Sequence, residues 1–373
     1  MISVNKTLIT DEDTSYVIES MNQGWFSSSG PFVEEFENLW GSYCGRQYSV
    51  AVSNGTTALI SAVAALELAP GDEVIVPNFT IISCSLAILM ADAIPVPIDC
   101  DLRTLNMDLD AIEAKITSRT RAIMVVHMYG HPTYMPRIVE IATKYNLRII
   151  EDAAEAHGAS YKNRDSTNSG YKKCGSEGDM STFSFYANKN ITTGEGGMVL
   201  TNNSKYFEKL LKLRNLGFGK ERNYLHEDFG YQFRLSSLQA ALGVPQIRRI
   251  DKIVERKKQI FEQYKNQLSN LGYLKFLDIE EWAKPSYWVV PIILREDFMT
   301  GNKFREKLLT KGIETRPMFL GLNRQPIYSK LDFFESSSFP NSDSTYQYGL
   351  FLPSGVGTTD EDVASICEEI SKF

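Results

Sequence analysis

The chain of 373 residues is 43% hydrophobic and 23% charged, which is ordinary for a globular protein and allows one large or two smaller domains. Its formal net charge of -7 argues against a nucleic-acid or anionic-membrane partner, because both require dense basic patches. No signal peptide or bilayer-spanning stretch is visible, and the scattered cysteines and histidines lack ligand spacing, so we expect a cytoplasmic protein without a metal site.

The first half of the chain predicts an α/β fold with a mostly parallel sheet. Short β-rich runs alternate with segments in which apolar residues recur at helical spacing. Such alternation places helices on both faces of the sheet, and ligands then bind beyond the carboxyl ends of the strands. The predicted strands are residues 48–52, 73–76, 94–98, 122–126 and 148–151, and the predicted helices are residues 57–68, 82–91, 109–115 and 137–145.

The C-terminal part predicts a second, smaller α/β domain. The polar residues 162–178 are expected to form a surface loop, with a contribution to a binding site as the alternative. A long amphipathic helical pattern over residues 246–272 then leads to a strand-like run at 287–294 and to helices near 302–311 and 360–371. We therefore predict a large domain of residues 1–245 and a small domain of residues 246–373.

Lys189 is the strongest chemical signal. It lies in the sequence SFYANKNITTGEGG, residues 184–197, which follows a strand-like run at 180–185. Burial disfavours the ammonium form of a lysine, so its amine becomes a nucleophile that can form a Schiff base with an aldehyde cofactor. A surface lysine in a glycine-rich turn is the alternative, and this segment alone does not separate the two.

Asp152 ends another β run, in the sequence IIEDAAEAHG of residues 149–158. Pyridoxal phosphate (PLP) needs an acidic partner at its ring nitrogen, because the protonated ring is the electron sink for transamination. A helix N-cap is the more common role for a lone aspartate after a strand. Together with Lys189 downstream, however, Asp152 favours the cofactor role.

The sequence VSNGTTAL, residues 52–59, joins a strand to a helix through small and hydroxylated residues. The N-terminus of a helix exposes unpaired N–H groups and a partial positive charge, which suits a phosphate. Such caps are common, so this motif is weak on its own. It also lacks the glycine patterns of P-loops and dinucleotide-binding folds.

A phosphate site, a ring-nitrogen carboxylate and a lysine thus follow three strands in order. With these features the sequence resembles the fold-type-I, PLP-dependent sugar aminotransferases of the DegT/DnrJ/EryC1/StrS type. The resemblance runs from about Gly24 to Tyr328 and includes, besides the Lys189 segment, WFSSSG (25–30), SNGT (53–56), GDEVIVP (71–77), HMYGH (127–131), EDAAE (151–155), GYQFRL (230–235) and TRP (315–317).

The resemblance implies an aspartate aminotransferase-like fold and a set of cofactor residues. Lys189 is implied to be the Schiff-base lysine and proton shuttle, and Asp152 is implied to hold the pyridinium proton. Glu155 is implied to contact the ring-hydroxyl side of the cofactor, where many family members have glutamine. Thr56, Thr57 and Ser184 are implied to bind the cofactor phosphate, and Gly55 is implied to be a further cofactor-binding residue.

Family members complete each active site with a second subunit, so the resemblance also implies a homodimer. Arg234, with Gln232 as a further candidate, matches the segment that the second subunit contributes to the cofactor site. On the substrate side, the matching residues are Trp25, Ser27, Ser28, Tyr186 and Arg316.

Residues around Lys189 are similar to the family members that aminate C4 of the sugar and form perosamine or viosamine. The triplet Tyr186-Ala187-Asn188 and the sequence after Lys189 carry this similarity. The resemblance therefore implies a GDP-, dTDP- or UDP-linked 4-keto-6-deoxyhexose as acceptor and L-glutamate as amino donor, with 2-oxoglutarate released. The product would enter O-antigen lipopolysaccharide or another glycan.

Two positions depart from the family pattern. Ile81 stands where an aromatic side chain is expected to stack on the cofactor. An aliphatic contact there would weaken cofactor binding by roughly 0.5–1.5 kcal/mol unless Phe79 or another group compensates. Asn323 stands where many relatives have histidine, which affects the substrate contacts more than the reaction type.

Other interpretations remain open. The same family could act on a 3-keto sugar or a keto-inositol, and a non-catalytic PLP-fold sensor is a third interpretation. Lys189 together with Asp152 argues against the sensor. Lys189 also argues against the dehydratase members, in which histidine replaces the lysine. The missing glycine fingerprint disfavours a nicotinamide-dependent oxidoreductase.

Overall fold

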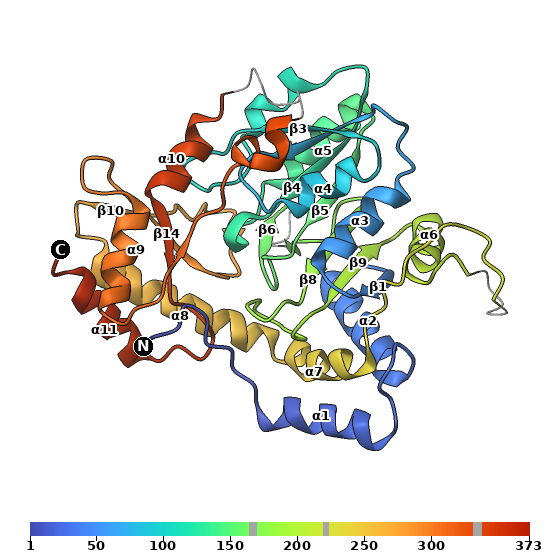
Figure 1. Ribbon diagram of the computed structural model, residues 1–373, viewed down its shortest axis with the longest axis horizontal. Coiled ribbons are helices and arrows are strands. Elements are labelled where there is room, and N and C mark those ends of the chain that lie inside the picture. The colour runs from blue at the N-terminus through green and yellow to red at the C-terminus, as the bar shows by residue number, and fades with distance from the viewer. Residues whose placement is uncertain (164–169, 219–223, 331–337) are drawn as a thin grey trace.

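A seven-stranded sheet with the order β1-β9-β8-β5-β4-β2-β3 forms the centre of the larger part of the protein (Figure 1). The computed structural model describes residues 1–163, 170–218, 224–330 and 338–373. Most neighbouring strands pair in parallel, whereas β9 pairs antiparallel with both β8 and β1. The predicted, mostly parallel α/β sheet is therefore confirmed. Its strands are β1 (Tyr48–Val52), β2 (Glu73–Pro77), β3 (Ile94–Ile98), β4 (Thr120–Val126), β5 (Arg148–Asp152), β8 (Met180–Ser184) and β9 (Gly197–Thr201).

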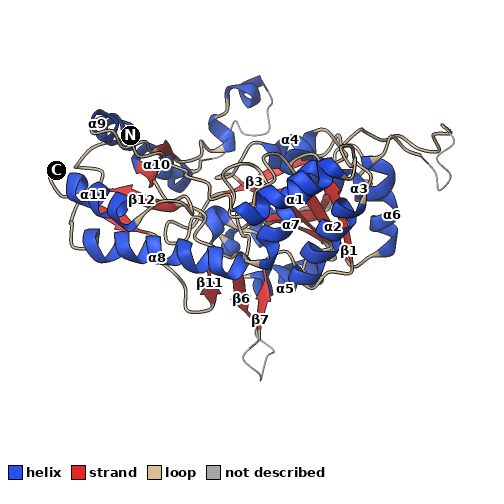
Figure 2. Ribbon diagram, turned by 90° about the horizontal axis from the view of Figure 1, so that it is seen from below, coloured by secondary structure: helices blue, strands red, loops and turns tan. Residues whose placement is uncertain are grey.

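Helices cover both faces of this sheet, because successive side chains of its buried strands point to opposite faces and both sets are apolar. In β4, Ile123 and Val125 join one core with α2, α5 and α7, whereas Met124 and Val126 join the other core with α3, α4 and α6. Figure 2 shows helices on both sides of the strands. The helices of this part are α1 (Asp11–Asn22), α2 (Pro31–Cys44), α3 (Gly55–Ala65), α4 (Ser83–Leu89), α5 (Met135–Tyr145), α6 (Ser204–Arg214) and α7 (Ser237–Arg248).

A four-stranded antiparallel sheet with the order β10-β12-β14-β13 organises the C-terminal part. Its core includes Phe261 from α8, Phe304 from α9 and Ile366 from α11. The N-terminus joins this part, since the Ile2 N–H donates to the Gly312 carbonyl at 2.7 Å. The elements are β10 (Leu274–Phe276), β12 (Val290–Leu294), β13 (Arg316–Pro317), β14 (Gly349–Leu352), α8 (Ile250–Leu268), α9 (Gly301–Thr310), α10 (Pro340–Tyr348) and α11 (Asp360–Ile370).

Two predicted helices differ from the structure. The segment predicted as a helix at 109–115 forms two 3₁₀ turns of three residues each, a tighter geometry that proteins use in short pieces. The helix predicted over 246–272 is divided at Arg249, whose φ of -114° and ψ of 16° separate α7 from α8. The domain boundary predicted after residue 245 falls within α7 and stays a prediction. The 3₁₀ turns are Leu109–Ala111, Glu113–Lys115, Met128–Gly130, Leu322–Arg324 and Pro326–Lys330.

A small three-stranded sheet, with the order β11-β6-β7, includes part of the segment predicted as a surface loop. The strands are β6 (Ser160–Lys162), β7 (Tyr171–Lys173) and β11 (Ala283–Lys284). Residues 164–169 of that predicted loop lie outside the described residues. Among the helices of the described ranges, none is long and apolar enough to cross a membrane.

Candidate active site

One cavity of about 540 Å³ lies where β1, β5 and β8 end, and the sequence-predicted residues converge on it. The three strands run in the same direction, so their carboxyl ends meet at one edge of the sheet. The predicted residues that line the cavity are Gly55, Thr56, Thr57, Ile81, Asp152, Glu155, Ser184, Tyr186 and Lys189.

Lys189 presents a nearly buried amine to this cavity. Its side chain is 11% exposed, and Nζ lies 3.9 Å from Glu155 Oε1 and 3.7 Å from the ring centre of Trp288. Burial lowers the pKa of Lys189, while the carboxylates of Glu155 and Asp152 oppose this shift. The result is an amine that is easier to deprotonate than an exposed lysine, as a nucleophile requires.

The turn that carries Lys189 is fixed by residues from the C-terminal part. Trp288 Nε1 donates to the Asn188 carbonyl at 2.8 Å, and Asn190 Nδ2 donates to the Ser286 carbonyl at 2.9 Å. These bonds bracket Lys189 on both sides along the chain. The amine is therefore held on a rigid turn, which is a requirement for precise chemistry.

Asp152 places a buried carboxylate at the end of β5. Oδ1 accepts the Ala154 N–H at 3.0 Å, and Oδ2 accepts the Cys84 thiol at 3.3 Å. Burial raises the pKa of Asp152, and the Ala154 and Cys84 hydrogen bonds and nearby Lys189 oppose that rise. A thiol is a weak donor, so Oδ2 keeps acceptor capacity for a protonated ring nitrogen.

Glu155 is oriented by the loop that follows β4. Its Oε2 accepts the Tyr129 N–H at 2.7 Å, and Tyr129 has a left-handed backbone with a φ of 51°. Burial raises the pKa of Glu155, whereas the positive charge of Lys189 lowers it. This carboxyl group therefore changes protonation more readily near neutral pH than an exposed glutamate does.

The N-terminus of α3 provides the candidate phosphate site. Asn54 caps the helix: its Oδ1 accepts the Thr57 N–H at 2.9 Å, and the Thr57 hydroxyl donates to the Asn54 carbonyl at 2.8 Å. The Thr57 side chain is thus engaged in the cap. The N–H groups of Gly55 and Thr56 precede the first intrahelical bond and are suited to an anion. A Cβ on Gly55 would lie 2.7 Å from Ser184 Cβ, so only glycine lets the helix start this close to β8.

Ile81 lies at the cavity with its side chain 39% exposed, as expected for a residue that would face the cofactor. Phe79 is fully buried, with its ring 6.0 Å from that of Tyr129, and is not among the residues that line the cavity. The structure therefore gives no compensating aromatic contact from Phe79. Aromatic rings reach the cavity from Trp288 and Phe319 instead.

Several predicted residues do not line the cavity of their own chain. Arg234 Nη1 donates to Asn215 Oδ1 at 2.9 Å, and Arg316 pairs with Glu314 at 2.8 Å. Trp25 packs against Gly30, where a Cβ would lie 2.7 Å from the indole. The Ser27 and Ser28 positions belong to the same turn before α2. The cofactor role of Arg234 and the substrate roles of Trp25, Ser27, Ser28 and Arg316 stay predictions.

Asn323, the second departure from the family pattern, has a structural partner. Asn78 Nδ2 donates to Asn323 Oδ1 at 2.9 Å, and the Asn323 N–H donates to Asn78 Oδ1 at 3.1 Å. Asn78 directly follows β2 and is fully buried. The pair joins the C-terminal part to the edge of the sheet where the cavity lies.

Sequence analysis did not single out Ser83, Cys84, Trp288 or Phe319 at this site. Ser83 and Cys84 begin the helix after β2, and a polar first turn at a strand end is a signal that could have singled them out. The Ser83 hydroxyl lies 2.8 Å from that of Thr56. Trp288 and Phe319 come from the C-terminal part, and no local motif identifies them.

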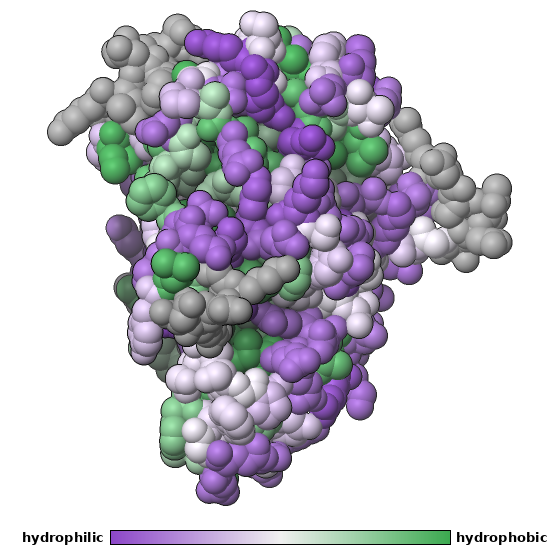
Figure 3. Space-filling model, turned by 90° about the vertical axis from the view of Figure 1, so that its right-hand side faces the viewer, coloured by the Kyte–Doolittle hydropathy of each residue, from purple (hydrophilic) through white to green (hydrophobic). Residues whose placement is uncertain are grey.

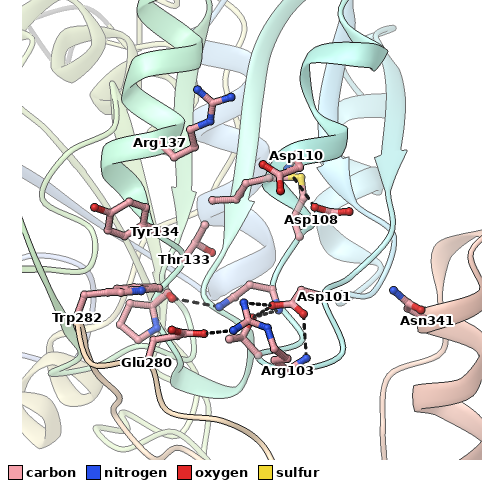
Figure 4. A pocket seen from close by; sticks show the side chains of 15 residues that line it. Asp101, Arg103, Asp108, Asp110, Thr133, Tyr134, Arg137, Glu280, Trp282 and Asn341 are labelled. Atoms are coloured by element: carbon pink, nitrogen blue, oxygen red, sulfur yellow. Dashed lines mark hydrogen bonds and ion pairs between the residues drawn. The ribbon is translucent and has the colours of Figure 1, made fainter. Parts of the chain in front are cut away.

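A second cavity, of about 590 Å³, contains none of the predicted residues (Figure 4). Arg103 pairs there with Glu280 at 2.7 Å and with Asp101 at 3.3 Å. The rings of Tyr134 and Trp282 lie 4.8 Å apart on its wall. The Arg103 guanidinium is paired with carboxylates, and no lysine lines this cavity, so it offers no amine that could form a Schiff base.

The first cavity fits the cofactor that the resemblance implies. Its volume lies within the range of about 300–1,000 Å³ that is typical of small-molecule sites. A helix N-terminus for the phosphate, a carboxylate for the ring nitrogen and an amine for the aldehyde face the same space. In the described ranges, no group of histidine, cysteine, aspartate and glutamate side chains could hold a metal ion.

Comparison with known proteins agrees with this chemistry. The sequence model of the DegT/DnrJ/EryC1/StrS aminotransferase family matches residues 7–371. The GDP-perosamine synthase of Escherichia coli O157:H7 is 38% identical over 375 residues, which cover 100% of this chain and 98% of that protein. The dTDP-3-amino-3,6-dideoxy-alpha-D-galactopyranose transaminase of Aneurinibacillus thermoaerophilus is 36% identical over 355 residues, covering 95% and 93%. Among solved structures, DesV of S. venezuelae has a TM-score of 0.89 at 29% identity, covering 97% of this chain and 94% of DesV.

Proposed function

Because the chain belongs to the DegT/DnrJ/EryC1/StrS aminotransferase family, and is therefore a PLP-dependent sugar aminotransferase, we propose that it aminates C4 of a nucleotide-linked 4-keto-6-deoxyhexose. L-Glutamate donates the amino group, and the product is a 4-amino-4,6-dideoxy sugar of the perosamine or viosamine type. The observation that carries this proposal is the Lys189 amine, held in one cavity with Asp152 and the start of α3.

Each of the cavity residues has a separate role in the proposed transamination. PLP, when bound, supplies an aldehyde for the lysine and a protonated ring that accepts electrons. Lys189 provides the amine and moves the proton at the carbon that exchanges nitrogen. Asp152 Oδ2 keeps the ring nitrogen protonated. The N–H groups of Gly55 and Thr56, with the Ser184 hydroxyl, bind the phosphate.

Amination at C4 is supported by the relatives and by the residues next to Lys189. The perosamine synthase of E. coli is 38% identical to this chain, but a transaminase named for a 3-amino sugar is 36% identical. Overall sequence identity alone therefore does not indicate whether C3 or C4 of the sugar is aminated. The Tyr186-Ala187-Asn188 triplet and the residues after Lys189 resemble the C4-acting members, and Tyr186 lines the cavity.

A coupled assay tests the substrate. The protein is supplied with PLP, L-glutamate and a panel of GDP-, dTDP- and UDP-linked 4-keto-6-deoxy sugars, and 2-oxoglutarate is measured. Turnover with one nucleotide series supports the proposal and identifies the product. Turnover only with a 3-keto sugar or a keto-inositol contradicts amination at C4 while leaving the aminotransferase reaction in place.

A homodimer with shared active sites is part of the proposal. Tyr224 and Phe229, in the segment between α6 and α7, are 88% and 97% exposed. Exposed hydrophobic side chains that gather in one place are typical of a protein interaction site. The space-filling view of the side that carries α6 shows hydrophobic residues scattered among hydrophilic ones (Figure 3).

Arg234 makes the shared site testable. It lies near the C-terminal end of that segment, and its Nε is buried without a hydrogen-bond partner in the described residues. We propose that Arg234 serves the cofactor site of the partner subunit. If Lys189→Ala and Arg234→Ala are each inactive, a refolded equimolar mixture should recover about a quarter of the wild-type activity, because half of the dimers carry one complete site. A mixture that stays inactive argues against the shared site.

The cellular role is proposed from the chemistry of the product. We propose a cytoplasmic enzyme that supplies an amino sugar to O-antigen lipopolysaccharide or another glycan. The five cysteines are all buried free thiols, as is usual in a reducing compartment. Fractionation of the native cells and immunodetection of the protein test this location, and recovery outside the cytoplasmic fraction contradicts it.

A further inference from the structure

We propose that Trp288 positions Lys189, and that its indole face is the surface on which the Lys189 ammonium group rests when that group is not bound to the cofactor. Lys189 Nζ lies 3.7 Å from the centre of the Trp288 ring. The face of an indole attracts a cation, and this attraction is strongest where water is excluded. The inference rests on the proposed function only in taking Lys189 as the reacting lysine.

Glu155 is the second group that contacts the Lys189 ammonium group in this position. Its Oε1 lies 3.9 Å from Lys189 Nζ, and its other oxygen is already occupied by the Tyr129 N–H. An ammonium group released into the cavity therefore meets a carboxylate and an aromatic face. Both favour the charged form, while burial disfavours it. Lys189 can thus take up a proton without leaving the site.

The indole of Trp288 is held in a single orientation. Its Nε1 donates to the Asn188 carbonyl at 2.8 Å, which ties it to the residue before Lys189. A Cβ on Gly130 would lie 3.2 Å from the Trp288 backbone nitrogen and 2.1 Å from the Ser286 hydroxyl, so this approach requires glycine at position 130. The Tyr129 ring stacks on the indole with a centroid distance of 6.1 Å.

Lys257 fixes the backbone of Trp288 from the other side. Its side chain lies in α8, the residue is 2% exposed, and Nζ donates to the Trp288 carbonyl at 2.8 Å and also to the Ser354 carbonyl. Burial lowers the pKa of Lys257 to about 7. A buried amine without an ion pair in the described residues is costly. The Lys257 amine links α8 and the segment after β14 to Trp288, the residue that faces Lys189.

Two roles of Trp288 predict opposite changes in the titration of Lys189. If the ring holds the ammonium group, its removal favours the neutral amine and moves the midpoint of titration to lower pH. If the ring only fills space, its removal admits water, relieves the effect of burial and moves the midpoint to higher pH. The direction of the shift therefore separates positioning from packing.

The experiment is competitive amine labelling of the full-length, cofactor-free chain over a range of pH, read for Lys189 by mass spectrometry. Trp288→Leu should move the midpoint of Lys189 labelling down by about 1.5 pH units, since a desolvated cation–π contact is worth about 2 kcal/mol and one unit is about 1.36 kcal/mol. Trp288→Phe keeps an aromatic face and should show a smaller shift. The matched control, Trp282→Leu in the second cavity, should show none.

A midpoint that rises or stays constant in both Trp288 variants overturns the inference. If circular dichroism shows that Trp288→Leu is unfolded, Trp288→Phe alone decides by the direction of its shift. Borohydride trapping of PLP on Lys189 of the unsubstituted protein tests the proposed function separately. Trapping with no shift in the variants contradicts only this inference, whereas a downward shift without trapping supports it and contradicts the proposed function.

Discussion

Two cavities among the described residues have similar volumes, about 540 and about 590 Å³, but only the first is lined by a nearly buried lysine. In the second cavity, Arg103 forms short ion pairs with carboxylates, and its side chain is 62% exposed. In the first, Lys189, Asp152 and Glu155 are nearly buried and their charges are incompletely paired. Buried, unbalanced charge distinguishes the active site, whereas cavity size does not.

The strongest test of this contrast is Lys189→Ala. Loss of the amine removes both the nucleophile and the proton carrier, so we expect turnover to fall by at least about 10³-fold. The assay measures 2-oxoglutarate formed from L-glutamate. Circular dichroism should show an unchanged fold, because only a side chain that faces a cavity is shortened. Residual activity above a few per cent would remove Lys189 from the mechanism.

Asp152→Asn is expected to have the next largest effect. Asparagine keeps the size of the side chain and can still accept the Ala154 N–H, but it carries no charge for the ring nitrogen. Loss of one preorganised electrostatic partner should reduce kcat by about 10²-fold. The comparison is made with PLP bound, as monitored by absorbance. Unchanged kcat in the loaded variant would show that another group protonates the ring.

The neighbouring Glu151 provides a matched contrast to Asp152. It is fully buried on the opposite face of β5 and accepts N–H groups of Gly175, Glu177 and Gly178 at 2.6–2.7 Å. Burial alone would raise its pKa, but His127, the Gly178 N–H and the charge of Arg46 hold the pKa of Glu151 below its ordinary value. Its stabilising contribution is therefore present above the pKa of the unfolded chain and is lost as pH falls through the folded-state pKa.

We expect Glu151→Gln to destabilise the fold by about 3 kcal/mol, since it leaves buried hydrogen-bond groups unsatisfied. Urea unfolding at neutral pH measures this loss, and the difference from the wild type should shrink in acid. Asp152→Asn should unfold close to the wild type. If the two variants exchange these effects, the assignment of one carboxylate to structure and the other to chemistry is wrong.

Glu155→Gln should have a smaller effect that depends on pH. The Glu155 carboxylate stabilises the Lys189 ammonium group, so its removal should move the titration of Lys189 to lower pH. Cofactor uptake requires the neutral amine, and the pH profile of the uptake rate should shift in the acid direction. Stopped-flow absorbance measures that rate. A shift in the alkaline direction would contradict the proposed pairing.

The sequence was sufficient to predict the mostly parallel sheet, apart from the antiparallel strand β9, and the strand ends that carry Asp152 and Lys189, because each lies in a contiguous strand-turn segment. It did not identify Cys84, which lies 68 residues before Asp152 in the chain and donates its thiol hydrogen to the Asp152 carboxylate. It also missed Trp288, which reaches Lys189 from the C-terminal part. Such pairs arise from tertiary packing, which local spacing does not encode. The helix predicted at 109–115 failed for a related reason, since periodicity does not measure whether a short helix is stable.

The smallest expected effect belongs to the second cavity. Arg103→Ala removes two ion pairs, but its guanidinium is exposed and screened by water, so we expect no measurable change in stability or in kcat. Urea unfolding and the coupled assay, performed beside Asp152→Asn, provide the comparison. A large loss of activity in Arg103→Ala would mean that the second cavity takes part in the reaction. Ion-paired, exposed charges would then not show that a cavity is inactive. An unchanged enzyme would show that a similar volume does not make an active site without buried, unbalanced charge.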